Sequence, residues 1–457
     1  MLFHTEAHAD RVAVLLPGGE RLSHRELAAR ADVAAEALRG TDLAAVECDN
    51  SIGSLVAYLA CLRRHVPVLL VDAGLDEGLK DTVQRQYGVS VVYRPAAADW
   101  VRGGGTAPRL HPELAVLLST SGSTGSPKLV RLSRRNIQAN AESICQYLAL
   151  SDASRAITAL PMQYSFGLSI IHSHLLAGGS VALTPQSITE RGFWDFFRAS
   201  ECDSFSGVPT MYEMLRRLRF ERMALPSLRT LTQAGGRLAP ESVRWFAELA
   251  AQRDWRFFVM YGQTEATARM AYLPPDLAID HPDSVGVAIP GGSFELRGAD
   301  GQPVERNGEI GELVYRGPNV MLGYAEAADD LALGDVQQGV LATGDLAERD
   351  AAGLHYVRGR TKRFVKVFGL RMSLDDIEGR LRGSGLDVRV TGRDDLLVVA
   401  GTDAAAVASA VDGIASTYRI HRSALAGFAV ETLPVSAAGK VLYGNLLEQF
   451  DTRKASA

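Results

Sequence analysis

Lysine is scarce in this chain of 457 residues. It provides only six of the 48 basic residues, and arginine provides the others. No apolar run reaches the roughly 18 residues that a membrane-spanning helix needs, and the first ten residues lack the basic start and apolar middle of a signal peptide. The formal net charge of −5 leaves no basic excess for nucleic acid or an anionic membrane. Composition therefore predicts a cytoplasmic protein with neither of these partners.

Cysteine is equally sparse. The chain has four cysteines, without the paired spacing of a metal site: Cys48, Cys61, Cys145 and Cys202. We interpret them as core or surface thiols in a reducing compartment. With 47% hydrophobic residues, a chain of this length can bury the cores of two or more domains.

Two of the six lysines close distinctive segments. Lys440 ends the segment 433–440, and Lys128 ends a segment rich in hydroxyls and glycine that begins Thr120, Ser121, Gly122, Ser123, Thr124, Gly125. Flexible backbone with many donors suits a polyphosphate. The segment is not a Walker A loop, because a Walker A loop ends in Gly-Lys and opens a helix. Here Pro127 stands directly before the lysine. The flanking apolar runs predict a hairpin with the segment at its tip; the alternative is a solvated turn.

Helical and strand patterns alternate along the chain, as in α/β proteins. Ser23 and Glu26 form a predicted capping box before a helix that extends to about residue 38. Apolar runs at 68–71, 89–92, 156–160 and 257–260 predict buried strands. Several glycine- and hydroxyl-rich motifs directly follow such runs. Ligands of open parallel sheets bind at these strand ends.

A domain boundary is predicted near Gly359, where a polar, basic joint begins. We expect one domain over 1–358 and a second over 359–457. In the second, 388–390 and 396–400 predict a hairpin and 404–415 a helix. Lys440 would then belong to a different domain from the phosphate-type segment.

Eight short motifs occur in one order along nearly the whole chain. They lie at 120–128, 161–167, 233–236, 261–265, 311–319, 343–345, 359–360 and 439–440. In these motifs the sequence resembles the adenylate-forming superfamily of acyl-CoA synthetases, nonribosomal-peptide adenylation domains and luciferases. The resemblance implies an α/β fold. It also implies a large N-terminal domain of mixed and parallel sheets with helices, followed by a small mobile C-terminal α/β domain carrying the catalytic lysine.

The resemblance also implies an activity. ATP would activate a carboxylic acid as an acyl-adenylate, and the acyl group would then pass to a thiol of coenzyme A or of a carrier protein in trans. Lys440, Thr264 and Glu265 would be catalytic, with Glu265 binding Mg²⁺ and Lys362 acting as the hinge. The nucleotide would contact residues 120–125 and Lys128 together with Gly235, Gly236, Tyr261, Gly262, Asp345 and Arg360.

The acid would lie against Tyr164, Phe166 and Gly262. This lining favours an aromatic or apolar acid. Three departures from the family pattern concern the second half-reaction: Tyr164-Ser165 and Arg134 stand where the family often has histidine, and Gly369 stands alone where thioester formers often have two glycines.

Other interpretations remain open at this point. The acceptor could be an amine, as in an amide ligase, or nitrite in a diazo-forming reaction, and the chain could be a nucleotide-binding regulator without turnover. Glu265 could be a helix first-turn acid, and Asp345 could cap a turn. His172 and His174 are interpreted as satisfied positions of an apolar helix rather than as catalytic bases.

Overall fold

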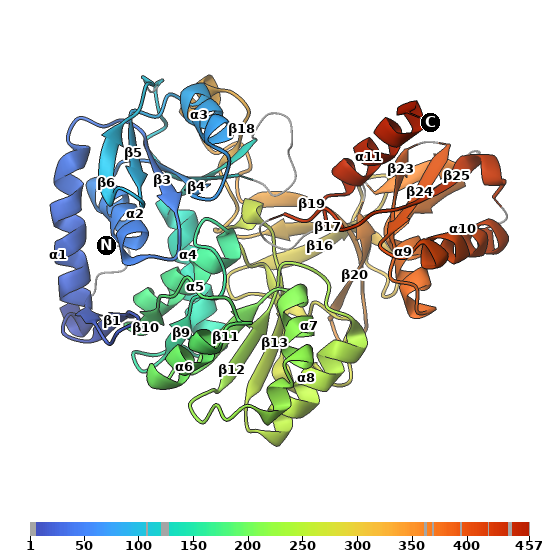
Figure 1. Ribbon diagram of the computed structural model, residues 1–457, viewed down its shortest axis with the longest axis horizontal. Helices are drawn as coiled ribbons and strands as arrows, with labels where there is room; N and C mark the ends of the chain where they lie inside the picture. Colours follow the sequence, from blue (N-terminus) through green and yellow to red (C-terminus); the bar gives the residue numbers. More distant parts are fainter. Residues whose placement is uncertain are drawn as a thin grey trace. The chain divides into compact units, whose positions relative to one another are not determined.

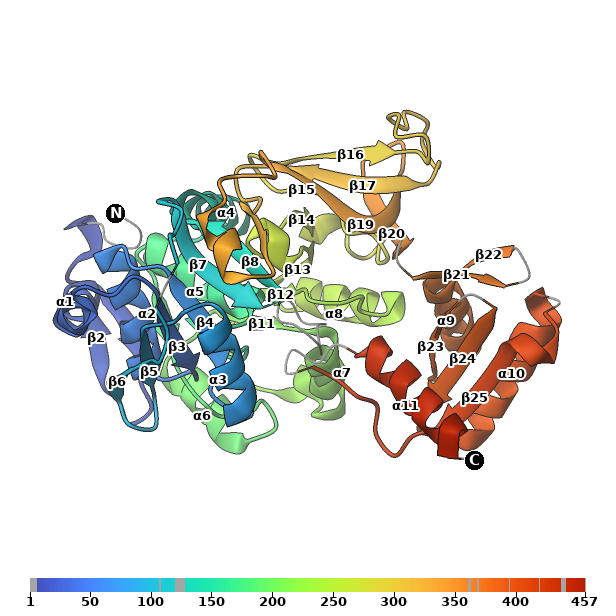
Figure 2. The same ribbon diagram turned by 90° about the horizontal axis from the view of Figure 1, so that it is seen from above.

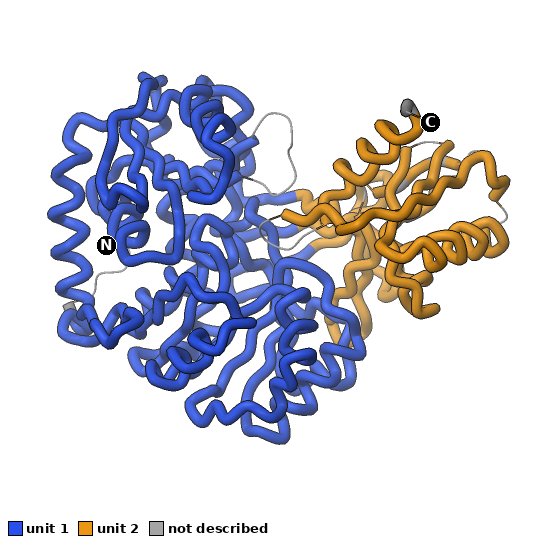
Figure 3. The backbone as a smooth tube through the Cα atoms, viewed as in Figure 1, with its two compact units in different colours: residues 1–294, 315–341 blue, residues 295–314, 342–457 orange. Residues whose placement is uncertain are grey.

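The computed structural model describes residues 6–106, 108–119, 128–360, 363–367, 370–393, 395–418, 420–436 and 441–456. The chain divides into two compact units, shown in Figure 3. Unit 1 comprises residues 1–294 and 315–341, and unit 2 comprises 295–314 and 342–457. Both contain sheets with packed helices, so the predicted α/β class is confirmed (Figure 1).

The larger sheet of unit 1 is parallel at its centre and antiparallel at its edges. Its strands, in spatial order, are β15 (Val287–Ala288), β14 (Ala271–Leu273), β13 (Arg256–Tyr261), β12 (Thr230–Gln233), β11 (Ser204–Gly207), β9 (Arg155–Ile157), β10 (Ser180–Ala182), β1 (Val12–Leu15) and β2 (Arg21–Ser23). Because β11, β12 and β13 run parallel in register, their carboxyl ends share one edge. The predicted motifs after 233 and around 261 therefore lie at neighbouring strand ends.

The second sheet of unit 1 is also mixed. Its order is β18 (Gly323–Ala325), β8 (Leu129–Ser133), β7 (Leu114–Ser119), β4 (Val68–Asp72), β3 (Ala44–Cys48), β5 (Val91–Arg94) and β6 (Asp99–Arg102). Strands β7 and β8 pair antiparallel, which confirms the hairpin predicted around the phosphate-type segment. Strand β18 extends the sheet beside β8, although almost 200 residues separate them.

Helices of unit 1 cover and separate these sheets (Figures 1 and 2). They are α1 (His24–Ala35), α2 (Ile52–Arg64), α3 (Glu77–Gln86), α4 (Arg134–Leu148), α5 (Ser165–Leu176), α6 (Arg191–Ala199), α7 (Pro209–Arg217) and α8 (Pro240–Gln252). One core cluster joins Val14 and Val181 of the larger sheet with Val46 and Leu70 of the second sheet, through Ile171 of α5. The burial of this shared core stabilises the two sheets as one body.

Unit 2 contains smaller sheets. One has the order β16 (Ser293–Arg297), β17 (Gly311–Arg316), β19 (Val340–Arg349) and β20 (His355–Arg360); β21 (Phe364–Val367) pairs with β22 (Leu370–Ser373), and β23 (Arg389–Arg393), β24 (Leu396–Gly401) and β25 (Leu425–Ala429) form another. The helices are α9 (Leu374–Gly383), α10 (Ala404–Tyr418) and α11 (Tyr443–Ser456). Pairing of β23 with β24 confirms the predicted C-terminal hairpin. The division into domains at 358/359 stays a prediction.

Local signals located several elements correctly. Ser23 and Glu26 form the capping box that begins α1, because each side chain accepts from the other's backbone N–H. The run 68–71 is β4 and 257–260 lies within β13. The strand predicted at 89–92 begins two residues later, at Val91. No helix among the described residues combines the length and apolarity needed to cross a bilayer.

Candidate active site

A tight turn follows β13 and carries Glu265, the acidic residue of the motif at 261–265. The chain leaves Tyr261, passes Gly262 and forms a short 3₁₀ helix over Thr264–Ala266. A Cβ atom at Gly262 would lie 1.7 Å from the carbonyl oxygen of Ala268, so only glycine fits. Ala268 has φ = 99°, a left-handed value that is costly for a residue with a side chain. The turn is therefore closely packed and conformationally strained.

Hydrogen bonds to the segment at residues 319–321 fix this turn. The N–H of Met321 donates to the Glu265 carbonyl over 2.8 Å, and the amide of Asn319 donates to the carbonyl of Ala266 over 2.8 Å. The Thr267 hydroxyl donates to the Asn319 carbonyl over 2.6 Å. None of these contacts uses the side chain of Thr264 or of Glu265.

The hydroxyl of Thr264 is oriented by helix α5. Its Oγ1 lies 3.0 Å from the Oγ of Ser165, the first residue of α5. Either hydroxyl can be the donor in this pair. The pair joins the turn after β13 to the start of α5, which lies within the motif at 161–167.

The carboxylate of Glu265 is held from strand β18. The Tyr324 hydroxyl donates to Glu265 Oε1 over 2.7 Å. Burial, and then the neighbouring Glu265 charge, raise the pKa of the Tyr324 hydroxyl, so it remains a neutral donor. The ammonium of Lys128 lies 3.7 Å from the centre of the Tyr324 ring and 3.0 Å from Glu326 Oε1. Lys128 and Glu265 thus contact the same tyrosine.

Aromatic side chains lie beside these groups at the carboxyl edge of the larger sheet. The Tyr164 ring meets the Phe166 ring edge-on, with centroids 6.3 Å apart. Gly235 has φ = 86°, and a Cβ atom there would lie 2.5 Å from the Tyr164 hydroxyl oxygen. The Gly236 carbonyl accepts from the Gln233 amide. Burial raises the pKa of Tyr164 to about 12, which keeps its hydroxyl neutral.

Unit 2 carries a separate ion pair. Asp345 of β19 and Arg360 of β20 are direct cross-strand partners, and Arg360 Nε donates to Asp345 Oδ1 over 2.7 Å. The Asp345 side chain is 2% exposed, whereas that of Arg360 is 56% exposed. The Asp345 N–H donates to the Thr343 hydroxyl, within the motif at 343–345. Two of the residues predicted to contact the nucleotide are therefore adjacent.

Residues 94–325, half of the chain, match the family model described as AMP-binding enzyme. They include the described turn after β13, Tyr164, Gly235 and Lys128. The chain belongs to the AMP-binding enzyme family. Its predicted membership of the adenylate-forming superfamily is confirmed.

Curated relatives of this AMP-binding enzyme are about one-third identical to it over the aligned part of the chain. It is 33% identical to a sulfoacetate–CoA ligase from Cupriavidus necator over 60% of this chain and 52% of that protein. It is 31% identical to an L-proline–[L-prolyl-carrier protein] ligase from Pseudomonas fluorescens over 69% and 64%. An indoleacetate–CoA ligase from Aromatoleum aromaticum is 31% identical over 73% and 67%. The matches thus span between about half and two thirds of these relatives.

Solved structures share the fold over nearly the whole chain. An O-succinylbenzoate coenzyme A synthetase from Bacillus subtilis, in complex with AMP, superimposes with a TM-score of 0.78, at 22% identity over 96% of this chain and 95% of that one. An anthranilate CoA ligase in complex with anthranoyl-AMP has a TM-score of 0.77, at 18% identity over 97% and 95%. At these identities the comparison establishes the fold.

The structure brings together part of the predicted site of this AMP-binding enzyme. In unit 1, Thr264, Glu265 and Lys128 are linked through Ser165 and Tyr324. Residues outside the described part of the chain are Thr120, Ser121, Gly122, Ser123, Thr124, Gly125, Lys362, Gly369 and Lys440. Their roles stay predictions.

Other predictions concerned residues of helices. His172 and His174 are buried in α5, with ring nitrogens 2.8 Å from the Tyr58 hydroxyl and 2.9 Å from the Ile170 carbonyl, respectively, so the interpretation as satisfied helix positions is confirmed. Arg134, which the resemblance placed where histidine often occurs, begins α4 and donates to the Leu62 carbonyl.

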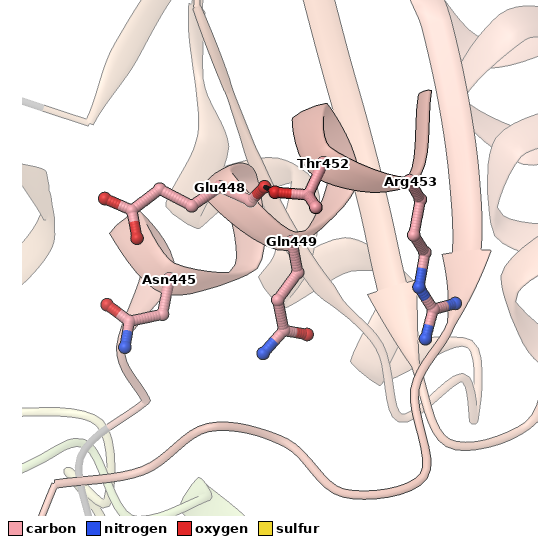
Figure 4. Close-up of a pocket in the computed structure, with 5 residues that line it drawn as sticks. All are labelled: Asn445, Glu448, Gln449, Thr452 and Arg453. Carbon is pink, nitrogen blue, oxygen red and sulfur yellow. Dashed lines mark hydrogen bonds between the residues drawn. The ribbon is translucent and has the colours of Figure 1, made fainter. Parts of the chain in front are cut away.

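The sequence did not predict the contacts of Ser165 with Thr264 and of Tyr324 with Glu265. Ser165 lies inside a recognised motif, and its hydroxyl beside Tyr164 was an available signal. Tyr324 lies 59 residues beyond Glu265 on a strand of the other sheet, and only the strand pairing brings them together. A hollow in unit 2 is lined by Asn445, Glu448, Gln449, Thr452 and Arg453 (Figure 4). All five come from α11, which is typical of a solvated helix face.

Proposed function

We propose that this AMP-binding enzyme uses ATP to activate a carboxylic acid as an acyl-adenylate and then transfers the acyl group to a thiol. The observation that carries the proposal is the turn after β13, in which Thr264 and Glu265 are presented side by side within the matched family region. Their side chains are held by Ser165 and Tyr324, so both groups are oriented before a ligand binds.

The first half-reaction joins two anions. An oxygen of the acid's carboxylate bonds to the α-phosphorus of ATP, the bond from that phosphorus to its bridging oxygen breaks, and pyrophosphate leaves with the electron pair. Thr264 donates to an α-phosphate oxygen, and the Lys440 ammonium neutralises the charge that develops. Asp345 accepts from the ribose hydroxyls. In the second half-reaction the thiol sulfur bonds to the acyl carbon, AMP leaves, and the thiol proton is released.

The residues present fit Mg²⁺. This cation commonly takes one or two carboxylates and completes its octahedron with water and substrate phosphates. Glu265 supplies one carboxylate: Oε1 accepts from Tyr324, and Oε2 has no hydrogen-bond partner among the described residues. No cluster of three or more metal-ligating side chains occurs in that part of the chain, which agrees with a cation carried by phosphate groups. When bound, Mg²⁺ neutralises phosphate charge.

The acid is proposed to be aromatic or apolar. Tyr164 and Phe166 lie at the carboxyl edge of the sheet, beside Ser165 and its partner Thr264. Met260, the residue before Tyr261, is buried in the same cluster. Aromatic and thioether groups gain most from apolar ligand surface.

Coenzyme A or the thiol of a carrier protein is the proposed acceptor. The relatives support both acceptors, because one is named a sulfoacetate–CoA ligase and another an L-proline–[L-prolyl-carrier protein] ligase. We place the reaction in the cytoplasm, which agrees with the four free cysteines.

ATP–pyrophosphate exchange over a panel of acids tests the activation step. The panel pairs aromatic and aliphatic monoacids of equal size with charged analogues. We expect exchange that depends on the acid and is fastest with an aromatic or apolar member. Tyr164→Ala and Phe166→Ala should change the ranking of the acids by about 1–3 kcal/mol in discrimination while the KM for ATP stays constant. Absence of acid-dependent exchange from the folded protein would contradict the proposed function.

A further inference from the structure

Tyr324 is the one described side chain that contacts both Glu265 and Lys128. Its hydroxyl donates to Glu265 Oε1 over 2.7 Å, and the centre of its ring lies 3.7 Å from the Lys128 ammonium. The ring is half-buried, between a predicted metal ligand and the last residue of the predicted phosphate segment. The two contacts use different parts of the side chain, so they can be removed separately.

The backbone of Tyr324 is fixed by the second sheet. Tyr324 pairs with Val130 across β18 and β8. The guanidinium of Arg131, which is fully buried, donates to the Tyr324 carbonyl over 3.1 Å and to the carbonyl of Leu322 over 3.3 Å. The Tyr87 hydroxyl donates to the next carbonyl, that of Ala325, over 2.8 Å. A side chain anchored in this way presents its hydroxyl at a fixed point.

The hydrogen bond selects one orientation of the Glu265 carboxylate. A carboxylate has two equivalent oxygens on a side chain with three rotatable bonds, and a donor to one oxygen restricts both rotation and displacement. Here Oε1 is occupied, while Oε2 has no partner among the described residues. Groups that orient a metal ligand in this way contribute to metal affinity without touching the metal.

We propose that Tyr324 is a positioning residue for nucleotide-bound Mg²⁺: its hydroxyl orients Glu265 so that Oε2 faces the cation, and its ring holds the Lys128 ammonium beside the phosphates. This inference rests on the proposed function. Loss of the hydroxyl weakens metal binding, because Glu265 must then be ordered when the cation arrives. Loss of the ring also weakens nucleotide binding, because Lys128 loses its platform.

Mn²⁺ binding separates this role from a purely structural one. The unbound Mn²⁺ signal is followed by electron paramagnetic resonance while the full-length protein and α,β-methylene-ATP are titrated. Tyr324→Phe keeps the ring and should weaken Mn²⁺ binding about tenfold, at the low end of the range for groups that orient a metal ligand. Tyr324→Leu should also raise the Kd of the nucleotide measured without metal, whereas Tyr324→Phe leaves that Kd unchanged.

Tyr87→Phe is the matched control. It deletes another hydroxyl that bonds to β18, but one that contacts the Ala325 carbonyl rather than Glu265. We expect wild-type Mn²⁺ affinity from this variant. Equal weakening by Tyr87→Phe and Tyr324→Phe would overturn the proposal, because the effect would then arise from displacement of the strand.

A double-mutant cycle tests whether Tyr324 acts through Glu265. Tyr324→Phe should add less than twofold to the loss caused by Glu265→Gln. A full tenfold loss in both backgrounds, or wild-type Mn²⁺ affinity in Tyr324→Phe, would overturn the proposal.

If Tyr324→Phe does not fold, Glu265→Asp provides the test, because its shorter side chain withdraws the carboxylate from Tyr324. Unchanged Mn²⁺ affinity in Glu265→Asp would also overturn the proposal. Failure of the proposed function gives a different result, the absence of acid-dependent exchange in the wild type.

Discussion

Glu265 and Asp345 are both acidic, but their surroundings predict different roles. Glu265 is half-buried and accepts from a neutral tyrosine, so its charge has no cation partner among the described residues. Asp345 is buried against the Arg360 guanidinium. A hard oxygen ligand that keeps its charge suits Mg²⁺, whereas a carboxylate held by arginine suits hydroxyl donors.

We therefore expect Glu265→Gln to raise the Mg²⁺ concentration that gives half-maximal exchange by about tenfold. Asp345→Ala should raise the KM for ATP and leave the Mg²⁺ requirement at its wild-type value, because Arg360 is exposed enough to be solvated when its partner is lost. Exchange is measured over a Mg²⁺ series at fixed ATP and then over an ATP series at saturating Mg²⁺. Identical Mg²⁺ curves for the two variants would contradict the assignment.

Gly262 is required by contact rather than by flexibility alone. A methyl group there would overlap the carbonyl of Ala268, whose own backbone is already in a left-handed conformation. Gly262→Ala should therefore lower the free energy of unfolding by about 1–3 kcal/mol and displace Thr264 and Glu265. All four tryptophans, at 100, 194, 245 and 255, lie in unit 1, so their fluorescence reports this unit in urea.

Gly104→Ala is the control for that prediction, because a Cβ atom there would have no neighbour within 4 Å. It should leave both stability and exchange unchanged. A Gly262→Ala protein with wild-type stability and exchange would show that the turn can relax, and would contradict the packing argument.

At the scale of elements, α5 carries two histidines in an apolar setting. Burial lowers the pKa of His172 to about 3 and, as the main cause, that of His174 to about 4. The folded state therefore keeps both rings neutral, while the unfolded chain protonates them below about pH 6.5. Because the unfolded state then binds more protons, stability is fully present above pH 6.5 and is lost as the pH falls toward the folded pKa values.

We expect the free energy of unfolding to decrease by about 2 kcal/mol for each histidine between pH 6.5 and pH 5. Urea unfolding followed by tryptophan fluorescence at several pH values measures this slope. His172→Gln cannot titrate but can still hydrogen-bond to the Tyr58 hydroxyl, so it should remove about half of the slope. A variant curve parallel to that of the wild type would contradict the assignment of the slope to His172.

The sequence predicted the elements that depend on residues close together in the chain. The capping box at Ser23, the hairpin of β7 and β8, and the strand ends at 233 and 261 each follow from a few adjacent residues. Residues 295–314 group with 342–457 through a sheet that pairs distant strands, a relation that no local pattern carries. A functional boundary near 359 stays a prediction.

The same distinction applies to the candidate site. Motifs predicted which residues lie at the sheet edge, because each motif is contiguous and follows a strand. The contacts that orient them are non-local: Ser165 reaches Thr264 from α5, and Tyr324 reaches Glu265 from the other sheet. The residue type at a position predicts which chemical group is present there, whereas the orientation of its side chain depends on the packing of the whole unit.

At the scale of the whole molecule, the proposed reaction uses groups from both units. Thr264 and Glu265 belong to unit 1, whereas Asp345 and the predicted Lys440 belong to unit 2. A lysine required only while two anions meet should matter for adenylation and not for thiol transfer. We expect Lys440→Ala to slow exchange by about two to three orders of magnitude, as for the loss of one transition-state donor, and to retain thioester formation from supplied acyl-adenylate.

The acceptor itself decides between the proposed function and its alternatives. Thiol transfer requires a narrow path for a pantetheine arm, and Gly369 is the glycine that the sequence offers for close approach. The wild type and Lys440→Ala are supplied with chemically prepared acyl-adenylate of the preferred acid, and then with coenzyme A, a phosphopantetheinylated carrier protein, an amine or nitrite. Product mass identifies the new bond. We expect a thioester from one of the two thiols with both proteins, since the supplied adenylate bypasses the step that Lys440 serves. Turnover with the amine or nitrite, together with an unreacted adenylate in the presence of both thiols, would contradict thiol transfer and favour an amide ligase or a diazo-forming enzyme built on the same adenylating site.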